Sequence, residues 1–219
     1  TGMQWAKREA ATVDVNSFSL LTFSFYGFRN DVKNILPWLL AQDADVVLIQ
    51  EIRPKQTKEL VAQVARHYPY IYHRDLNLPV TRKADETVTL SRLPFREVEE
   101  YKLNGLARHR VILDVNGRPL QVYNVHLEMP LIADHGWPHV PMSSLLSLYD
   151  ENIRNGQVRQ LVTLARATPY DTLLAGDFNL SEFSPIYDEL NAVAHDVYRE
   201  LNHDLGVTFP TGPSLGLGG

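Results

Sequence analysis

Short, almost continuously apolar runs constrain the fold of this chain more than any other feature. Val46 to Gln50 (VVLIQ) is such a run, and it is typical of a strand that is covered on both faces. Longer stretches between these runs carry apolar residues at i, i+3, i+4 and i+7, which is the spacing of an amphipathic helix. Strands, hairpins and helices mixed in this way predict an α/β fold built in layers with mixed sheets.

The expected strands are Phe18–Phe25, Val46–Gln50, Tyr70–His73, Thr87–Ser91, Arg108–Val115, Leu120–Leu127 and Asp171–Ala175. Helices are expected after Asn30, over Pro54–His67, over Asn155–Ala167, and from Ser184-Pro185 onward with Ile186, Leu190, Val193 and Val197 inward. Pro37 lies inside the first helical pattern and predicts either a kink or the true start of that helix. Asn116-Gly117 predicts a tight hairpin because both residues accept positive φ.

Composition limits the class of protein. The 219 residues suffice for one sizeable domain, and no run approaches the roughly 18 apolar residues that span a bilayer. The formal net charge of −5 argues against a protein whose main task is to grip nucleic acid through a basic surface. There are no cysteines, which excludes disulfides, zinc thiolate sites and cysteine nucleophiles. The chain starts at Thr1 and not at Met, so we expect a fragment or a processed chain.

Three of the expected strands stop on side chains that suit phosphate or metal chemistry. VVLIQ runs into Glu51, QVYNV runs into His126, and TLLAG runs into Asp177 and Asn179. Gly, Asp and Asn are also ordinary turn residues, so the last stretch alone fits a plain strand end. Ligands bind beyond one end of the strands in open α/β sheets, so polar groups at three strand ends favour one shared site.

The ordered motifs resemble those of the endonuclease/exonuclease/phosphatase superfamily. They are Gln50-Glu51, Asn124-Val125-His126-Leu127 and Gly176-Asp177-Phe178-Asn179, with supporting matches at Leu90-Ser91-Arg92 with Pro94, at Gln157 and Gln160, and at Thr208-Phe209. The similarity covers almost the whole chain and implies a four-layer α/β (α+β) sandwich of two mixed sheets flanked by helices. The stretch GFRND and the long loop after His126 resemble a bacterial subgroup whose domain often follows membrane-spanning helices, which implies a membrane tether upstream of this chain.

The resemblance implies the roles of a metal-dependent phosphoesterase. Glu51 would hold the metal, Mg²⁺ or Mn²⁺, which neutralises charge on the phosphoryl oxygens. Asp177 would orient the attacking water or take its proton, and Asn179 would donate hydrogen bonds to the phosphate. His126 would donate to a non-bridging phosphate oxygen. Two alternatives stay open for Arg92, contact with the substrate or an ion pair with a nearby carboxylate.

The sequence departs from the family pattern in two places. Ser24 stands where the family has a metal-binding Asn, and its shorter hydroxyl predicts weaker metal affinity or a water in the gap. Family members continue beyond the equivalent of Leu215-Gly216-Leu217 into an Asp-containing strand and an Asp-His pair, whereas this sequence ends at Gly219. We therefore expect residues 1–219 to be a single domain truncated at its C-terminus, with strands missing and little or no activity.

The leading functional prediction is a divalent-metal-dependent phosphoesterase that hydrolyses phosphodiester or phosphomonoester bonds by in-line attack of water. Its substrate is a nucleic acid or a small or lipid phosphoester, and the absence of a basic stripe favours the second. The alternative is a weakened or inactive family member that serves as a binding or regulatory module. Ser24 and the expected C-terminal truncation favour this alternative, whereas the intact Glu51, His126, Asp177 and Asn179 oppose it. A metal site on His135 and His139 is a weaker alternative because the two residues lack helix support. No obligate protein partner is evident, and the compartment stays open.

Overall fold

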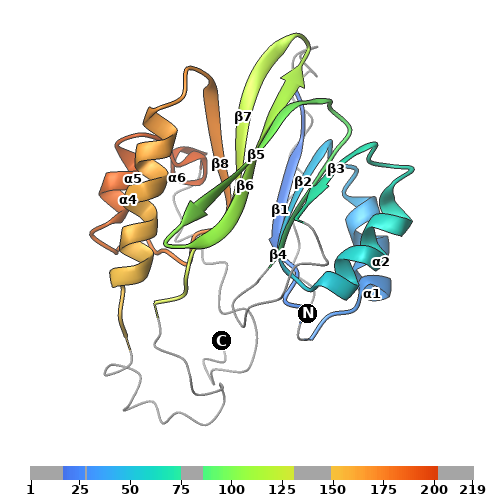
Figure 1. The fold of residues 1–219 in the computed structure, drawn as a ribbon, viewed down its shortest axis with the longest axis horizontal. Coiled ribbons are helices and arrows are strands. Elements are labelled where there is room, and N and C mark those ends of the chain that lie inside the picture. Colours follow the sequence, from blue (N-terminus) through green and yellow to red (C-terminus); the bar gives the residue numbers. More distant parts are fainter. Residues whose placement is uncertain (1–16, 28, 75–85, 131–148, 202–219) are drawn as a thin grey trace.

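A computed structural model describes residues 17–27, 29–74, 86–130 and 149–201. Two sheets lie face to face, and helices cover both outer faces (Figure 1). The order across the molecule is therefore helices, sheet, sheet and helices. This arrangement confirms the predicted α/β sandwich of two mixed sheets flanked by helices.

The first sheet has four strands in the order β1-β2-β4-β3. They are β1 (Leu20–Ser24), β2 (Val46–Ile52), β3 (Tyr70–His73) and β4 (Glu86–Ser91). β1 and β2 are parallel, whereas β4 runs antiparallel to both β2 and β3. The carboxyl ends of β1 and β2 therefore lie at the same end of this sheet.

The second sheet has four strands in the order β5-β6-β7-β8. They are β5 (Phe95–Leu103), β6 (Leu106–Val115), β7 (Arg118–His126) and β8 (Asp171–Asp177). β5, β6 and β7 form an antiparallel meander, and β8 pairs parallel to β7. The carboxyl ends of β7 and β8 therefore also share one end of their sheet.

Both hairpins of the second sheet turn on an Asn-Gly pair. Asn116 and Gly117 have φ values of 52° and 85°, which confirms the predicted hairpin between β6 and β7. Asn104 and Gly105 have φ values of 49° and 84° and form the same kind of turn between β5 and β6. β5 itself was not predicted, because its residues (FREVEEYKL) are mostly charged and do not alternate strictly between apolar and polar.

The helices agree with the predictions except near the end of the described chain. α1 (Val32–Ala41), α2 (Pro54–Val64) and α4 (Asn152–Arg166) lie where helices were expected. α1 begins at Val32, so Pro37 lies inside the helix and does not mark its start.

The long helix predicted from Ser184-Pro185 onward is wrong. Two short helices replace it, α5 (Tyr187–Asn191) and α6 (Val197–Leu201). Asp196 explains the break, because its Oδ1 accepts a hydrogen bond from the backbone N–H of Arg199 at 3.1 Å, while its Oδ2 accepts one from the Tyr187 hydroxyl at 2.8 Å. Asp196 thus caps the first turn of α6, and a residue in the N-cap position has a non-helical backbone, so one continuous helix cannot run through it.

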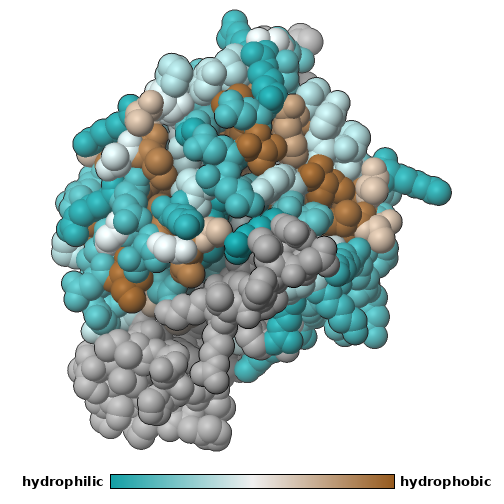
Figure 2. All heavy atoms as spheres, viewed as in Figure 1, coloured by the Kyte–Doolittle hydropathy of each residue, from teal (hydrophilic) through white to brown (hydrophobic). Residues whose placement is uncertain are grey.

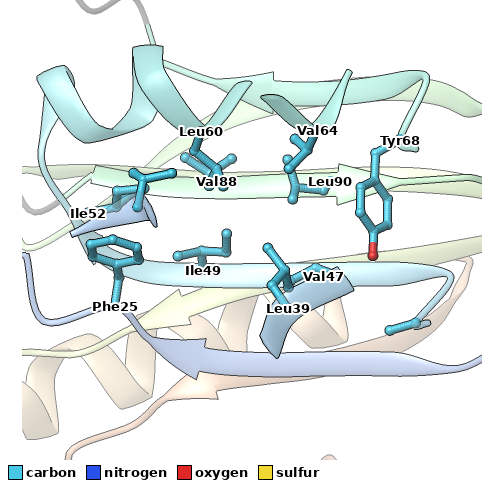
Figure 3. Packing of buried hydrophobic residues seen from close by; sticks show 12 residues of the cluster. Phe25, Leu39, Val47, Ile49, Ile52, Leu60, Val64, Tyr68, Val88 and Leu90 are labelled. Atoms are coloured by element: carbon cyan, nitrogen blue, oxygen red, sulfur yellow. The ribbon is translucent and has the colours of Figure 1, made fainter. Parts of the chain in front are cut away.

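Three apolar layers hold the four layers of elements together. Val47 and Ile49 of β2 pack with Leu60 of α2 between the first sheet and its helices (Figure 3). Val46 and Leu48, the alternate residues of the same strand, pack against the second sheet. A third layer joins the second sheet to α4 and is made of buried residues that include Tyr123, Val125, Leu161 and Val162.

The surface is mixed in character. On the face that Figure 2 shows, hydrophilic residues predominate among those coloured, and the apolar residues lie in separate small groups. Within the described ranges of the chain, no helix is long and apolar enough to cross a membrane.

Candidate functional site

Four strand ends meet at one edge of the sandwich. Ser24 ends β1, Glu51 lies near the end of β2, and His126 and Asp177 end β7 and β8. The Ser24 hydroxyl donates a hydrogen bond to Asp177 Oδ2 at 2.9 Å, and His126 Nε2 lies 3.7 Å from Glu51 Oε1. Each contact joins one sheet to the other, so the site straddles the seam between the two sheets.

Strand alternation explains the direction of three of these side chains. Leu20 in β1, Val122 in β7 and Leu173 in β8 face the layer between the sheets. Side chains on one strand face repeat every second residue, so Ser24, His126 and Asp177 continue these same rows beyond the apolar layer. The site is therefore the polar end of the core that lies between the sheets.

Glu51 reaches the site only because its strand is irregular. In a regular strand it would follow Val47 and Ile49 toward the helices. Its φ of 55° and a register shift between Ile49 and Ile52 insert one extra residue, so Ile52 takes the helix-facing position in its place. Bulges of this kind redirect single side chains and are frequent next to active sites.

Gly176 and Asn179 have backbone conformations that their neighbours require. Gly176 has φ 142°, and a Cβ there would lie 2.0 Å from the backbone oxygen of Val125 in the adjacent strand. Asn179 has φ 45°, a left-handed conformation that Asn tolerates better than most residues. The stretch Gly176-Asp-Phe-Asn is therefore more than a plain strand end, since β8 approaches β7 closely and then turns sharply.

Asn179 joins the segments that follow β7 and β8. Its backbone N–H donates to Asp177 Oδ1 at 3.0 Å, and its Nδ2 donates to the carbonyl of Leu127 at 2.8 Å. One of the two amide N–H groups is thus used within the protein. The resemblance did not predict this contact.

The donor atoms of Glu51, His126 and Asp177 are close enough to surround one cation. One ligand atom from each residue lies within 4.8 Å of those from the other two. The carboxylates of Glu51 and Asp177 suit a hard divalent cation such as Mg²⁺ or Mn²⁺, and the imidazole beside them can either bind the cation or donate a hydrogen bond to a phosphate oxygen. These residues therefore fit the metal that the family resemblance implies.

A buried polar layer lies directly beneath the site. Gln50 Nε2 donates to Asn124 Oδ1 at 2.8 Å across the two sheets and to Thr22 Oγ1 at 3.1 Å. Asn124 Nδ2 in turn donates to the carbonyl of Val88 at 3.0 Å. Gln50 and Asn124 belong to the sequence motifs, but sequence reasoning assigned them no role, although amide residues inside otherwise apolar strands are a signal for such a layer.

The structure does not bring Arg92 to this site. β4 runs antiparallel to β2, so the backbone N–H of Arg92 bonds to the carbonyl of Asp45, at the opposite end of β2 from Glu51. At about 3.3 Å per residue, roughly 17 Å of strand separate the two ends. The Arg92 guanidinium pairs with Asp43 at 2.6 Å, which agrees with the ion-pair alternative, and Arg92 lies apart from the other candidate residues.

Other predictions fall on residues outside the described ranges. They are the match at Thr208-Phe209, the pair His135 and His139, and everything expected of the two ends of the chain.

Comparisons with known proteins agree with this geometry. A model of the Endonuclease/Exonuclease/phosphatase family matches residues 11–214. A crystal structure of humanized D. rerio TDP2 with 14 mutations matches with a TM-score of 0.61 at 17% identity, over 84% of this chain and 71% of that one. Sphingomyelinase C from Streptomyces griseocarneus matches with a TM-score of 0.56 at 22% identity, over 80% and 69% of the two chains.

A protein of Leptotrichia buccalis, described as an endonuclease/exonuclease/phosphatase family protein, matches with a TM-score of 0.55 at 12% identity, over 80% of this chain and 74% of that one. No curated protein matches the chain. At these identities the structural matches show the fold alone. The family model covers almost all of the sequence, including the motifs at the four strand ends. The chain belongs to the endonuclease/exonuclease/phosphatase family.

Proposed function

We propose that this protein is a divalent-metal-dependent phosphoesterase. The observation that carries the proposal is the convergence of Glu51, His126 and Asp177, which come from strands far apart in the sequence. Members of the family hydrolyse phosphoester bonds, and this cluster has the groups that such a reaction needs.

The proposed roles are those that the family resemblance implies, and the positions of the residues support them. Glu51 holds the cation, Mg²⁺ or Mn²⁺, which when bound neutralises charge on the phosphoryl oxygens. Asp177 orients the attacking water or takes its proton, with its Oδ2 held by the Ser24 hydroxyl. His126 Nε2, 3.7 Å from the Glu51 carboxylate, donates to a non-bridging oxygen, and Asn179 donates its second amide N–H to the phosphate.

We propose a small or lipid phosphoester as the substrate, in preference to a nucleic acid. The formal net charge of −5 gives little long-range attraction for a polyanion. Structural neighbours include both kinds of protein, because D. rerio TDP2 has been solved with a single-strand DNA product and another neighbour is a sphingomyelinase. The membrane tether upstream of this chain stays a prediction.

The decisive experiment measures hydrolysis of bis-p-nitrophenyl phosphate with Mg²⁺, with Mn²⁺ and with EDTA. We expect turnover only when a divalent cation is present. Glu51→Gln and Asp177→Asn should each lower kcat by about 100-fold or more, because the first weakens the binding of the cation and the second removes the carboxylate that orients the attacking water or takes its proton. Plasmid DNA and a choline phosphodiester lipid, tested in parallel, separate the two substrate classes.

Glu59→Gln is the matched control, since Glu59 is an exposed acid on α2 and should leave kcat unchanged. Equal turnover by wild type, Glu51→Gln and Asp177→Asn would refute the proposal. Metal binding by calorimetry without turnover on any substrate would favour the binding-module alternative, which Ser24 supports by standing in place of the family Asn.

A further inference from the structure

Two polar side chains lie in the apolar stripe of α4. The buried residues of this helix are Arg154, Gln157, Val158, Leu161 and Val162, which share one face at helical spacing. Arg154 is 2% exposed and Gln157 is fully buried, although arginine is rarely buried unless it is paired. Burying these groups carries a desolvation cost, so their contacts indicate what they do.

Gln157 holds the segment after β7. Its Oε1 accepts a hydrogen bond from the backbone N–H of Glu128 at 2.7 Å, two residues beyond His126. Its Nε2 is buried and has no hydrogen-bond partner among the described residues. The anchoring contact is therefore made by the oxygen alone.

Arg154 holds the segment after β8. Its Nη1 donates to the carbonyl of Asn179 at 2.7 Å, two residues beyond Asp177. Its Nη2 lies 2.6 Å from Glu151 Oε1 and 3.2 Å from Ser184 Oγ, which fixes the guanidinium plane. The planar fork thus spans a backbone carbonyl and a carboxylate at the same time.

The two segments are also bonded to each other. Leu127 N–H donates to the carbonyl of Asp177 at 2.9 Å, and Asn179 Nδ2 donates to the carbonyl of Leu127 at 2.8 Å. One helix, α4, therefore anchors the segments after β7 and β8, and each anchored residue lies two residues beyond a side chain of the proposed site. The hydrogen bonds between the two segments connect them directly as well.

We propose that Arg154 and Gln157 are positioning residues, which from one face of α4 fix the segments after β7 and β8 and thereby set the placement of His126 and Asp177. The inference rests on the proposed function for its effect on turnover, whereas its effect on the two segments is independent of activity. Misplacing a reacting group by about 1 Å can cost on the order of 100-fold in rate.

A purely structural role for these side chains makes a different prediction. Buried polar groups that only fill space would, when replaced, lower stability without changing the order of particular backbone segments. The helix offers matched controls. Gln160 Oε1 accepts from Asn104 N–H at 2.8 Å in the β5–β6 hairpin, and Arg159 pairs with Glu189 at 3.2 Å on the exposed side.

The first test is amide hydrogen exchange by NMR on the full 219-residue chain. In Gln157→Ala the Glu128 amide should exchange about tenfold faster while the Asn104 amide stays within about twofold of wild type. Gln160→Ala should give the reverse pattern. Arg154→Lys should speed exchange of the Asn179 amide by a similar factor, because lysine lacks the fork that holds the Asn179 carbonyl and the looser segment weakens the bond from this amide to Asp177 Oδ1, and Arg159→Lys should not.

The second test is steady-state hydrolysis of bis-p-nitrophenyl phosphate by the same proteins. Gln157→Ala and Arg154→Lys should lower kcat about tenfold or more with KM within about threefold of wild type, and both control variants should match wild type. If Gln157→Ala does not fold, Gln157→Asn replaces it, since the shorter side chain withdraws the acceptor oxygen.

Unchanged exchange at Glu128 and Asn179, or an equal fall in kcat in the variants and their controls, would overturn the inference. A wild-type protein that neither hydrolyses the substrate nor binds Mn²⁺ would count against the proposed function, and amide exchange alone would then decide whether α4 positions the two segments.

Discussion

At the scale of single residues, the Ser24 hydroxyl makes a short contact between the two sheets at the site. It comes from β1 in the first sheet and donates to Asp177 Oδ2 in the second at 2.9 Å. An intramolecular hydrogen bond contributes about 0.5–1.5 kcal/mol, so this one, although exposed to solvent, favours one orientation of the carboxylate. Ser24, which departs from the family pattern, therefore has a definite partner here.

We predict that Ser24→Ala lowers kcat about tenfold, because a loss of about 1.4 kcal/mol in orientation corresponds to that factor. Ser24→Thr keeps the hydroxyl and suits a strand, so it should retain most of the activity. Steady-state kinetics at saturating Mn²⁺ measure both. Wild-type kcat in the alanine variant would mean that the Asp177 carboxylate is held by other groups.

Site residues were predictable from the sequence wherever the strands are regular. His126 and Asp177 follow the alternation of their strands and belong to the family motifs, and Ser24 follows the same alternation although it departs from its motif. The direction of Glu51 was not predictable, because a left-handed residue inside a strand leaves no pattern of apolar and polar residues. The position of Arg92 was not predictable either, since the motif does not show that β4 runs antiparallel to β2 and therefore ends at the opposite end of the sheet from Glu51.

At the scale of elements, the close approach of β7 and β8 depends on Gly176. Any side chain there would have its Cβ 2.0 Å from the Val125 carbonyl oxygen, and φ 142° is a conformation that other residues rarely adopt. The parallel pairing carries Asp177 to its place beside His126. Separation of these two strands would therefore disturb the site as well as the sheet.

We predict that Gly176→Ala destabilises the fold by about 3 kcal/mol or more, the sum of a steric clash and backbone strain. Gly156→Ala is the matched control. Gly156 lies inside α4 with nothing within 4 Å of an added Cβ, so alanine there should stabilise by about 1 kcal/mol through helix propensity. Urea unfolding followed by circular dichroism measures both. A neutral Gly176→Ala variant would contradict the close approach of the strands.

Helices and strands with a regular spacing of apolar residues were predicted from the sequence, and elements without such a spacing were not. All seven predicted strands are present. The strand that was missed, β5, lies at the edge of its sheet, is mostly charged, and shows no strict alternation of apolar and polar residues. The Asn104-Gly105 pair was an available signal for the second hairpin, since it has the same composition as Asn116-Gly117. The division between α5 and α6 depends on a side-chain cap at Asp196, which competes with an apolar spacing that continues across it.

At the scale of the whole molecule, one parallel strand pair in each sheet brings the motifs together. β1 and β2 end at the seam from one side, and β7 and β8 from the other. Layers could be predicted from apolar runs and helical spacing, but the strand order β1-β2-β4-β3 depends on long-range pairing that no local pattern encodes. The seam also holds a buried histidine, His109 of β6, which lies beside the polar layer because it and Asn124 both contact the Thr89 hydroxyl.

His109 makes the stability of the whole sandwich depend on pH. It is 3% exposed, its two ring nitrogens form hydrogen bonds with the hydroxyls of Thr87 and Thr89 at 3.1 and 2.7 Å, and its ring packs on that of Tyr72. Burial, helped by the charges of Arg108 and His73, lowers the pKa of His109 from 6.5 to about 3. The folded protein therefore keeps this ring neutral at mildly acidic pH, while the unfolded chain binds a proton below about pH 6.5.

The contribution of the neutral ring to stability is thus complete above pH 6.5 and is lost as the pH falls toward 3, because only the unfolded state gains a proton there. We predict that between pH 6.5 and 5.0 the free energy of unfolding falls by about 1.5 kcal/mol more in wild type than in His109→Gln. Urea titrations at both pH values measure the difference, and carboxylates that titrate in both proteins cancel in it. His67→Gln, at an exposed histidine on the turn after α2, is the control for the loss of a histidine as such. The same pH slope in wild type and His109→Gln would mean that the ring is protonated in the folded protein, and that the seam opens to water more readily than its packing indicates.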